Sequence, residues 1–86
     1  MKYRIELKPK VVKDIRTIPK SDATRMANAL EALYDNLQGD VKKLTNFSPE
    51  YRLRIGNYRA LFEVEKPDLV VIYRIKHRKE IYKRGA

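Results

Sequence analysis

The chain has 86 residues, a length that predicts a single domain over residues 1–86. It contains 20 Lys and Arg residues against 11 Asp and Glu residues, so its formal net charge is +9. It has no cysteine and one histidine, which excludes disulfides and thiolate metal sites and leaves a zinc site short of ligands. Its apolar runs are too short for a membrane span or a signal peptide. We therefore expect a cytoplasmic protein with no membrane, metal or cofactor partner.

The positive charge is concentrated at the two ends of the chain. Residues 1–20 and 51–86 carry net charges of +5 and +6, whereas residues 21–50 carry −2. So large a basic excess on a small domain predicts a polyanionic partner, and nucleic acid is the commonest one. The alternative is a basic surface that only keeps the protein in solution.

Alternation and helical spacing predict the elements in the first half of the chain. Residues 2–7, KYRIEL, alternate polar and apolar side chains as a half-buried strand does. Residues 9–18 and 21–38 repeat apolar side chains at helical spacing. Prolines stand at both ends of the first of these segments, and a glycine follows the second. Residues 40–50 contain a proline near their end, and we expect them to form a connector.

The second half of the chain predicts three strands. Residues 51–64 alternate on both sides of a Gly-Asn pair, and the apolar run LVVIYRI follows at residues 69–75. The order is then strand, helix, helix and three strands. This order predicts a small α+β domain in which two helices pack on one face of an antiparallel sheet.

The stretch YRLRIGNYRALFEV at residues 51–64 predicts a hairpin with charges on one side. A two-residue Gly-Asn turn, of type II′ or I′, makes Arg54 face Arg59 and puts Arg52 two residues along on the same side. The opposite side collects Tyr51, Leu53, Ile55, Tyr58, Ala60, Phe62 and Val64. The apolar side is therefore the predicted core side.

Three arginines on one side of a hairpin predict a surface that binds an anion. Like charges facing each other across two strands cost up to about 1 kcal/mol, which a bound anion would offset. A second turn at residues 65–68 would pair Leu61 with Ile72. It would also pair Arg59 with Arg74, which then joins the same surface. The alternative is a solvated sheet face, although such a face would mix Thr, Ser, Glu and Lys rather than repeat Arg.

These motifs resemble one known family. YRLRIGNYRALFEV, followed by VVIYRIKHRKEIYKR, resembles the RelE toxins of the RelE/ParE superfamily. The resemblance runs over essentially the whole chain and is most specific in residues 51–84. It implies a RelE-like fold and the toxin of a type II toxin–antitoxin system. It also implies a metal-independent, ribosome-dependent endoribonuclease that cuts mRNA in the ribosomal A site.

The resemblance also implies partners and site residues. The partners are mRNA, the ribosome with its rRNA, and a cognate antitoxin, with operator DNA bound only through that antitoxin. The implied catalytic residues are Arg52, Arg54, Arg59, His77, Arg78 and Tyr82. A shift of the role of Arg78 to Lys76 or Lys79 stays open. The expected RNA-binding residues are Arg74, Lys76, Lys79, Lys83 and Arg84.

The chemistry of RNA cleavage suggests what these residues do. When a 2′-hydroxyl attacks the adjacent phosphorus, cations must hold the developing phosphoryl charge, and the planar fork of arginine suits this task. We expect Arg52, Arg54 and Arg59 to do so, with Arg59 in the centre. His77 is the candidate for proton transfer, and Tyr82 for proton transfer or stacking on a base. Alternatively, His77 is an ordinary strand-end histidine and Tyr82 packs the tail on the sheet.

Two other functions are compatible with the sequence. One is a ParE-like poison of DNA gyrase, although that branch usually lacks the full basic set with a C-terminal tyrosine. The other is a non-catalytic RNA-binding module.

Several RelE relatives have lysines where this chain has Arg52 and Arg54, and arginine stays protonated near neutral pH. If a lysine supplies the base in those relatives, this protein must use another group.

Overall fold

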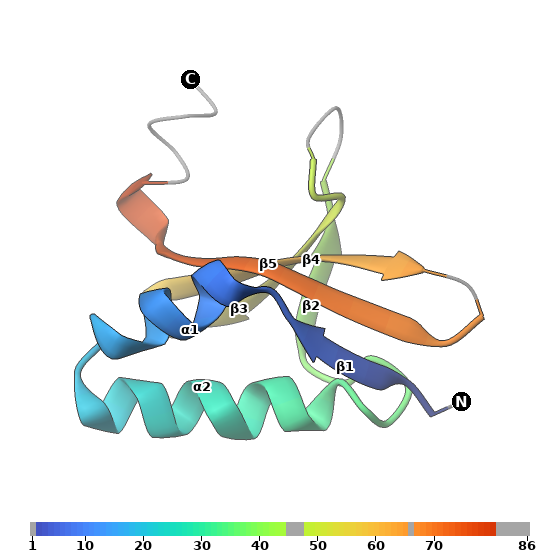
Figure 1. Ribbon diagram of the computed structural model, residues 1–86, viewed down its shortest axis with the longest axis horizontal. Coiled ribbons are helices and arrows are strands. Elements are labelled where there is room, and N and C mark those ends of the chain that lie inside the picture. Colours follow the sequence, from blue (N-terminus) through green and yellow to red (C-terminus); the bar gives the residue numbers. More distant parts are fainter. Residues whose placement is uncertain (1, 45–47, 66, 81–86) are drawn as a thin grey trace.

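The chain folds into one strand, two helices and then four further strands in the described residues. The computed structural model describes residues 2–44, 48–65 and 67–80, and Figure 1 shows the arrangement of their elements. In chain order these elements are β1 (Arg4–Leu7), α1 (Pro9–Arg16), α2 (Lys20–Ala32), β2 (Asp40–Lys43), β3 (Tyr51–Ile55), β4 (Tyr58–Glu65) and β5 (Leu69–His77). The predicted α+β class is confirmed. None of the described helices is long and apolar enough to cross a membrane.

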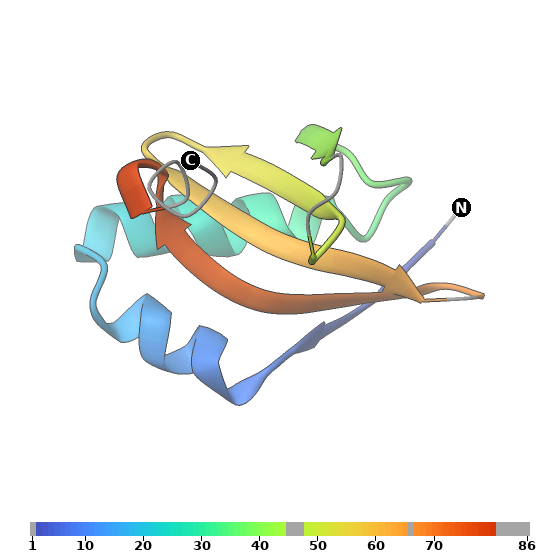
Figure 2. The ribbon, with the colours of Figure 1, turned by 90° about the horizontal axis from the view of Figure 1, so that it is seen from above.

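The strands form one mixed sheet in the order β1-β5-β4-β3-β2. All neighbouring pairs are antiparallel except β1 and β5, which are parallel, so the expectation of a purely antiparallel sheet was wrong. The strand β1 pairs with the first half of β5, and α1, which comes directly after β1, lies along the second half of β5 (Figure 2). The chain therefore passes β5 from its first half to its second half, which makes β1 parallel to β5. The predicted connector at residues 40–50 was also wrong in part, because β2 forms an edge strand there.

The apolar side chains of both helices pack against one face of the sheet. The α2 helix lies across that face, and α1 lies beside β5 (Figures 1 and 2). The buried core consists of Val11, Ile18, Met26, Leu30, Leu33, Leu53, Ile55, Ala60, Phe62, Val70, Ile72 and Ile75. Most of the apolar side chains predicted to face the core do so, but Val12 and Tyr34, which the helical spacing placed on the same stripes, are exposed at 44% and 50%. However, α2 ends at Ala32, because Asn36 and Leu37 turn the chain with φ angles of 61° and 56°.

The first hairpin has the predicted register. Arg54 faces Arg59, and each of the other predicted pairs in β3 and β4 is also present. Gly56 has a φ of 57°, whereas Asn57 does not have a positive φ, which is the combination of a type II′ turn.

The second hairpin has a different register from the predicted one. Leu61 faces Arg74, and Arg59 faces Lys76, because an irregularity between Leu61 and Phe62 leaves Tyr73 without a partner in β4. If the observed pairing of Phe62 with Ile72 continued along β5 without this extra residue, Arg74 would face the core side. The bulge instead keeps Arg74 on the same side as Arg59 and turns Ile75 into the core.

Candidate nucleic-acid interface

Two rows of side chains cross the face of the sheet opposite the core. The first row runs from Asp40 in β2 through Arg54 and Arg59 to Lys76 in β5, as the strand registers require. Beyond Lys76, the carboxylate of Glu80 lies 3.6 Å from the Lys76 ammonium. Three cations in a line are thus bounded by one carboxylate at each end.

The second row also contains three cations, but an apolar residue interrupts it and only one of its ends has a carboxylate. It runs from Lys42 in β2 through Arg52 and Leu61 to Arg74 in β5, and Asp14 of α1 binds Arg74 at its end. We call the six cations of the two rows the basic face; they are Lys42, Arg52, Arg54, Arg59, Arg74 and Lys76. Lys42 was missed by sequence reasoning, because its segment was interpreted as a connector. The alternation of DVKK beside a hairpin was the available signal.

Arg59, the expected centre of the site, is largely buried, with 7% of its surface exposed. Its Nη1 donates to the carbonyl oxygens of Gly56 at 3.0 Å and of Tyr58 at 2.9 Å. The guanidinium thus turns back along its own strand and holds the hairpin turn.

Arg52 and Arg54 share the carboxylate of Asp40. Arg52 Nη1 lies 3.3 Å from Asp40 Oδ1, and Arg54 Nε lies 4.0 Å from Asp40 Oδ2. The same Arg52 nitrogen donates to the backbone carbonyl of Asp40 at 2.9 Å. The Arg52 side chain is 19% exposed and that of Arg54 is 56% exposed. Among the arginines described on this face, Arg54 is therefore the one most open to a ligand.

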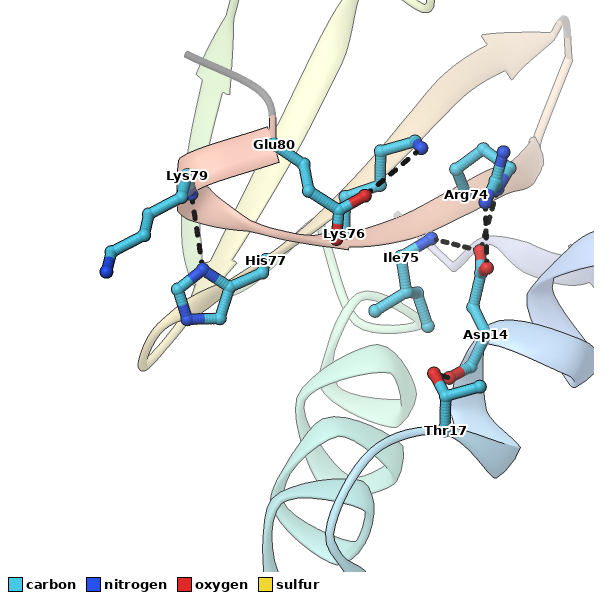
Figure 3. Close-up of polar contacts among 8 residues, drawn as sticks. All are labelled: Asp14, Thr17, Arg74, Ile75, Lys76, His77, Lys79 and Glu80. Atoms are coloured by element: carbon cyan, nitrogen blue, oxygen red, sulfur yellow. Dashed lines mark hydrogen bonds and ion pairs between the residues drawn. The ribbon is translucent and has the colours of Figure 1, made fainter. Parts of the chain in front are cut away.

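Arg74 is fixed by a second aspartate (Figure 3). Its Nε and Nη2 donate to the two carboxylate oxygens of Asp14 at 2.8 and 2.9 Å, and the Ile75 backbone N–H donates to the same carboxylate at 2.9 Å. Burial alone would raise the pKa of Asp14, but these hydrogen bonds and the charges of Arg74 and Lys76 outweigh it and lower the pKa below 3.8. The hydrogen bond from Arg74 to Asp14 likewise raises the pKa of Arg74. This pair ties α1 to β5.

His77 lies away from the basic face. It is paired with Tyr58, and the two rings meet edge to face with centroids 5.4 Å apart, on the side of the sheet that carries the core. In Figure 3 the ring points to the opposite side of β5 from Arg74 and Lys76. Its Nδ1 accepts a hydrogen bond from the Lys79 N–H at 3.2 Å, as a residue that caps the start of a helical turn does.

The remaining predicted residues lie at or beyond the end of β5. Arg78 and Lys79 are exposed on the helical turn at residues 78–80, and the Arg78 N–H donates to the carbonyl of Asn57 at 2.8 Å. Tyr82, Lys83 and Arg84 lie outside the described residues. The fold thus brings together five predicted residues, Arg52, Arg54, Arg59, Arg74 and Lys76, and keeps His77 apart from them.

The basic face is suited to an anion that spans several cations. Its accessible guanidinium groups can meet two oxygens of a phosphate at once, and a row of cations about one strand apart can follow a polyanionic chain. In the ranges 2–44, 48–65 and 67–80, no group of three or more His, Cys, Asp or Glu residues could hold a metal ion. The face therefore offers phosphate binding rather than metal ligation through its described side chains.

Comparison with known proteins shows that this chain is similar to toxins. A family model described as the ParE toxin of the type II toxin–antitoxin system parDE matches residues 5–82. Two relatives from Methanocaldococcus jannaschii, which carry the names RelE1 and RelE3, are 32% and 34% identical to this chain. The alignments cover 96% and 83% of this chain and 98% and 85% of the relatives.

Two solved structures have the same fold. One is the RelB–RelE antitoxin–toxin complex from Methanococcus jannaschii, with 30% identity, a TM-score of 0.77, and coverage of 94% of this chain and 99% of that one. The other is the archaeal RelE–RelB complex from Pyrococcus horikoshii OT3, with 30% identity, a TM-score of 0.75, and coverage of 91% and 97%. Both similarities extend over nearly the whole of each chain.

Proposed function

Because the chain belongs to the RelE/ParE superfamily and is a RelE-type toxin of a type II toxin–antitoxin system, we propose that it is an endoribonuclease that cuts mRNA in the ribosomal A site. The observation that carries this proposal is the basic face. Arg52 and Arg54 lie two residues apart in β3, so both side chains are on this face. The names of the relatives support the toxin class, and the charge supports an RNA substrate.

The reaction assigned to this face has one bond formed and one broken. The ribose 2′-oxygen attacks the adjacent phosphorus and loses its proton, and the bond from phosphorus to the 5′-oxygen breaks. The products are a 2′,3′-cyclic phosphate and a 5′-hydroxyl, which takes up a proton. Arg52 and Arg54 bind the phosphoryl oxygens and stabilise the charge that develops on them. Arg59 stabilises the turn between β3 and β4 through its hydrogen bonds to the carbonyls of Gly56 and Tyr58.

In this proposal His77 is not the group that transfers a proton. Its Nδ1 already accepts the Lys79 N–H, and the ring lies on the core side of the sheet. Of the two candidates for this step, His77 and Tyr82, we therefore expect Tyr82 to contribute more. In this proposal Arg78 and Lys79 contact RNA at the end of β5, and such contacts are salt-sensitive. The reaction requires no metal ion.

The proposed partners are mRNA, the ribosome and a cognate antitoxin. The solved structures similar to this chain are complexes of RelE with RelB, which supports an antitoxin partner for this chain as well. Operator DNA would be bound only through that antitoxin. Since the substrate is on the ribosome, the toxin acts in the cytoplasm.

A cleavage assay on programmed ribosomes tests this function. We expect the purified protein to cut a defined mRNA at the codon in an empty A site and to leave the same mRNA intact without ribosomes. The R54Q variant should bind ribosomes but cut far more slowly. Intact mRNA on active ribosomes at all toxin concentrations would contradict the proposal and favour a non-catalytic RNA-binding module.

A second candidate is supported by the name of the matching family model, which describes a ParE toxin. In this case the protein would bind and poison DNA gyrase, as the family resemblance implies for the ParE branch. A supercoiling assay with purified gyrase separates the two functions. Inhibition of supercoiling without cleavage of mRNA on ribosomes would favour the gyrase function.

A further inference from the structure

We propose that the carboxylate of Asp40 occupies the position of an RNA phosphate between Arg52 and Arg54 and weakens RNA binding until RNA displaces it. This inference rests on the proposed function in one respect, namely that RNA is the ligand of the basic face. It concerns the affinity of that face and makes Asp40 a residue that regulates access to the two arginines.

The contacts of Asp40 resemble those that a bridging phosphate would make. One carboxylate oxygen lies 3.3 Å from Arg52 Nη1, and the other lies 4.0 Å from Arg54 Nε. A phosphodiester also offers two terminal oxygens and a single negative charge. Exchange of the carboxylate for a phosphodiester therefore keeps the local charge balance and the number of acceptor oxygens.

The position of Asp40 is determined by the backbone before it. Gly39 has a φ of 128°, and a Cβ atom there would lie 2.8 Å from Leu53 Cδ1, so the entry into β2 requires glycine. The next residue, Asp40, is then paired directly with Arg54 in the sheet. The carboxylate is thus held at the edge of the two arginines by the geometry of β2.

The pair is held weakly enough to open. The side chains of Asp40 and Arg54 are both 56% exposed, and the contact to Arg54 is long at 4.0 Å. Ion pairs in such surroundings contribute little because water and salt screen them. Arg52 also donates to the backbone carbonyl of Asp40 at 2.9 Å, a contact that does not depend on the carboxylate. Arg52 can therefore keep its orientation when the carboxylate moves away.

Binding of a short single-stranded RNA, measured by fluorescence anisotropy at low salt, tests this inference. We expect D40N to bind RNA about two- to fivefold more tightly than the wild type, the range that loss of one exposed ion pair allows. D40E keeps the charge and should bind more like the wild type than D40N does. The control D35N removes the same charge from a pair with Lys2, outside the basic face, and should leave the affinity unchanged.

A double-mutant cycle locates the effect. The gain from D40N should disappear when Arg52 and Arg54 are both replaced by Gln, because the carboxylate then has no cations to occupy. An unchanged affinity in D40N, an equal gain in D35N, or a gain that persists in the double Gln background would each overturn the inference.

The outcome is also separable from the proposed nuclease function. Tighter RNA binding by D40N together with failure of the wild type to cut mRNA on ribosomes would support the inference and contradict only the nuclease function. Cleavage by the wild type together with an unchanged RNA affinity of D40N would support the nuclease function and contradict the inference. Absence of RNA binding by the wild type would overturn the inference together with the proposed RNA ligand.

Discussion

The two flanks of the basic face each pair an aspartate with arginine, but in opposite ways. On the β5 flank, the Asp14 side chain is 13% exposed and binds Arg74 through two hydrogen bonds shorter than 3.0 Å. On the β2 flank, Asp40 is well exposed and lies at 3.3 and 4.0 Å from its two arginines. The same pair of residue types is thus a structural tie on one side and a loose contact on the other.

The number of arginines on the face is therefore not the number of arginines that can bind a ligand. Arg74 belongs to the basic face by its position, yet its charge is already neutralised by a half-buried partner. Arg59 donates to two backbone carbonyls and is largely buried. Arg54 has only a long contact with the exposed Asp40 carboxylate. Arg52 donates to the backbone carbonyl of Asp40 and to the same carboxylate, which can leave. The ligand-binding capacity of the face is therefore concentrated on the β2 side.

The largest expected effect is on the β2 flank. We expect R54Q to lower the rate of mRNA cleavage on ribosomes by about 10²–10³-fold, the loss seen when one preorganised group that stabilises developing charge is removed. Its free energy of unfolding should change by less than about 0.5 kcal/mol, because the side chain is exposed. The matched control R4Q removes an exposed arginine that pairs with Asp68 in another part of the sheet. Equal losses of activity in R54Q and R4Q would show that only total charge matters.

The β5 flank should respond in stability. We expect D14N to lower the free energy of unfolding at pH 7 by about 1–3 kcal/mol, because Arg74 and the Ile75 N–H lose a charged acceptor. D68N, which weakens an exposed pair with Arg4, should cost no more than about 1 kcal/mol. Urea unfolding of both variants measures this difference, and equal costs would contradict the structural role of Asp14.

The same variant has a pH dependence of known sign. The pKa of Asp14 is lower in the folded protein than its ordinary value. The carboxylate therefore contributes its full stability above the pKa of an unfolded aspartate, about 3.9. That contribution is lost as the pH falls through the lower folded pKa. The gap in stability between wild type and D14N should accordingly shrink on acidification, and a gap that widens would contradict this assignment.

Replacement of His77 at the end of β5 should have a smaller effect on stability. We expect H77A to lose about 0.5–1 kcal/mol of stability, because the Lys79 N–H loses its capping acceptor. Its cleavage rate should fall far less than the roughly 10²–10⁴-fold that loss of a general acid or base produces. The Y82F variant, assayed in parallel, should lose roughly tenfold or more. The opposite ranking of these two variants would return proton transfer to His77.

The smallest expected effect is at the sheet edge. Lys42 faces Arg52 on the basic face, whereas the next residue, Lys43, points to the other side and pairs with Glu50. We expect K42Q to lower RNA affinity about twofold and to reduce the slope of log affinity against log salt by about 0.7. K43Q is the matched control and should leave that slope unchanged. Identical slopes for the two variants would mean that RNA does not reach the β2 edge.

Local signals predicted the first hairpin completely and the second only in outline. A two-residue turn and a period of two leave one register for β3 and β4, since a slip by one residue would turn the apolar side outward. The register of β4 and β5 depends on the extra residue Tyr73, which no turn signal reveals. The edge strand β2 was missed because it has a single apolar residue, Val41, and its identity as a strand depends on pairing with β3.

Local sequence patterns were sufficient to predict the α+β class, most of the helical core residues, the first hairpin and the side of that hairpin on which the arginines lie. These features follow from periodicity, turn chemistry and charge, which act over a few residues. The cations that can reach a ligand are apparent only from the packed fold. Asp14 lies 60 residues from Arg74, and Asp40 lies 12 residues from Arg52. Their contacts depend on how distant strands and a helix come together, and no local pattern contains that information.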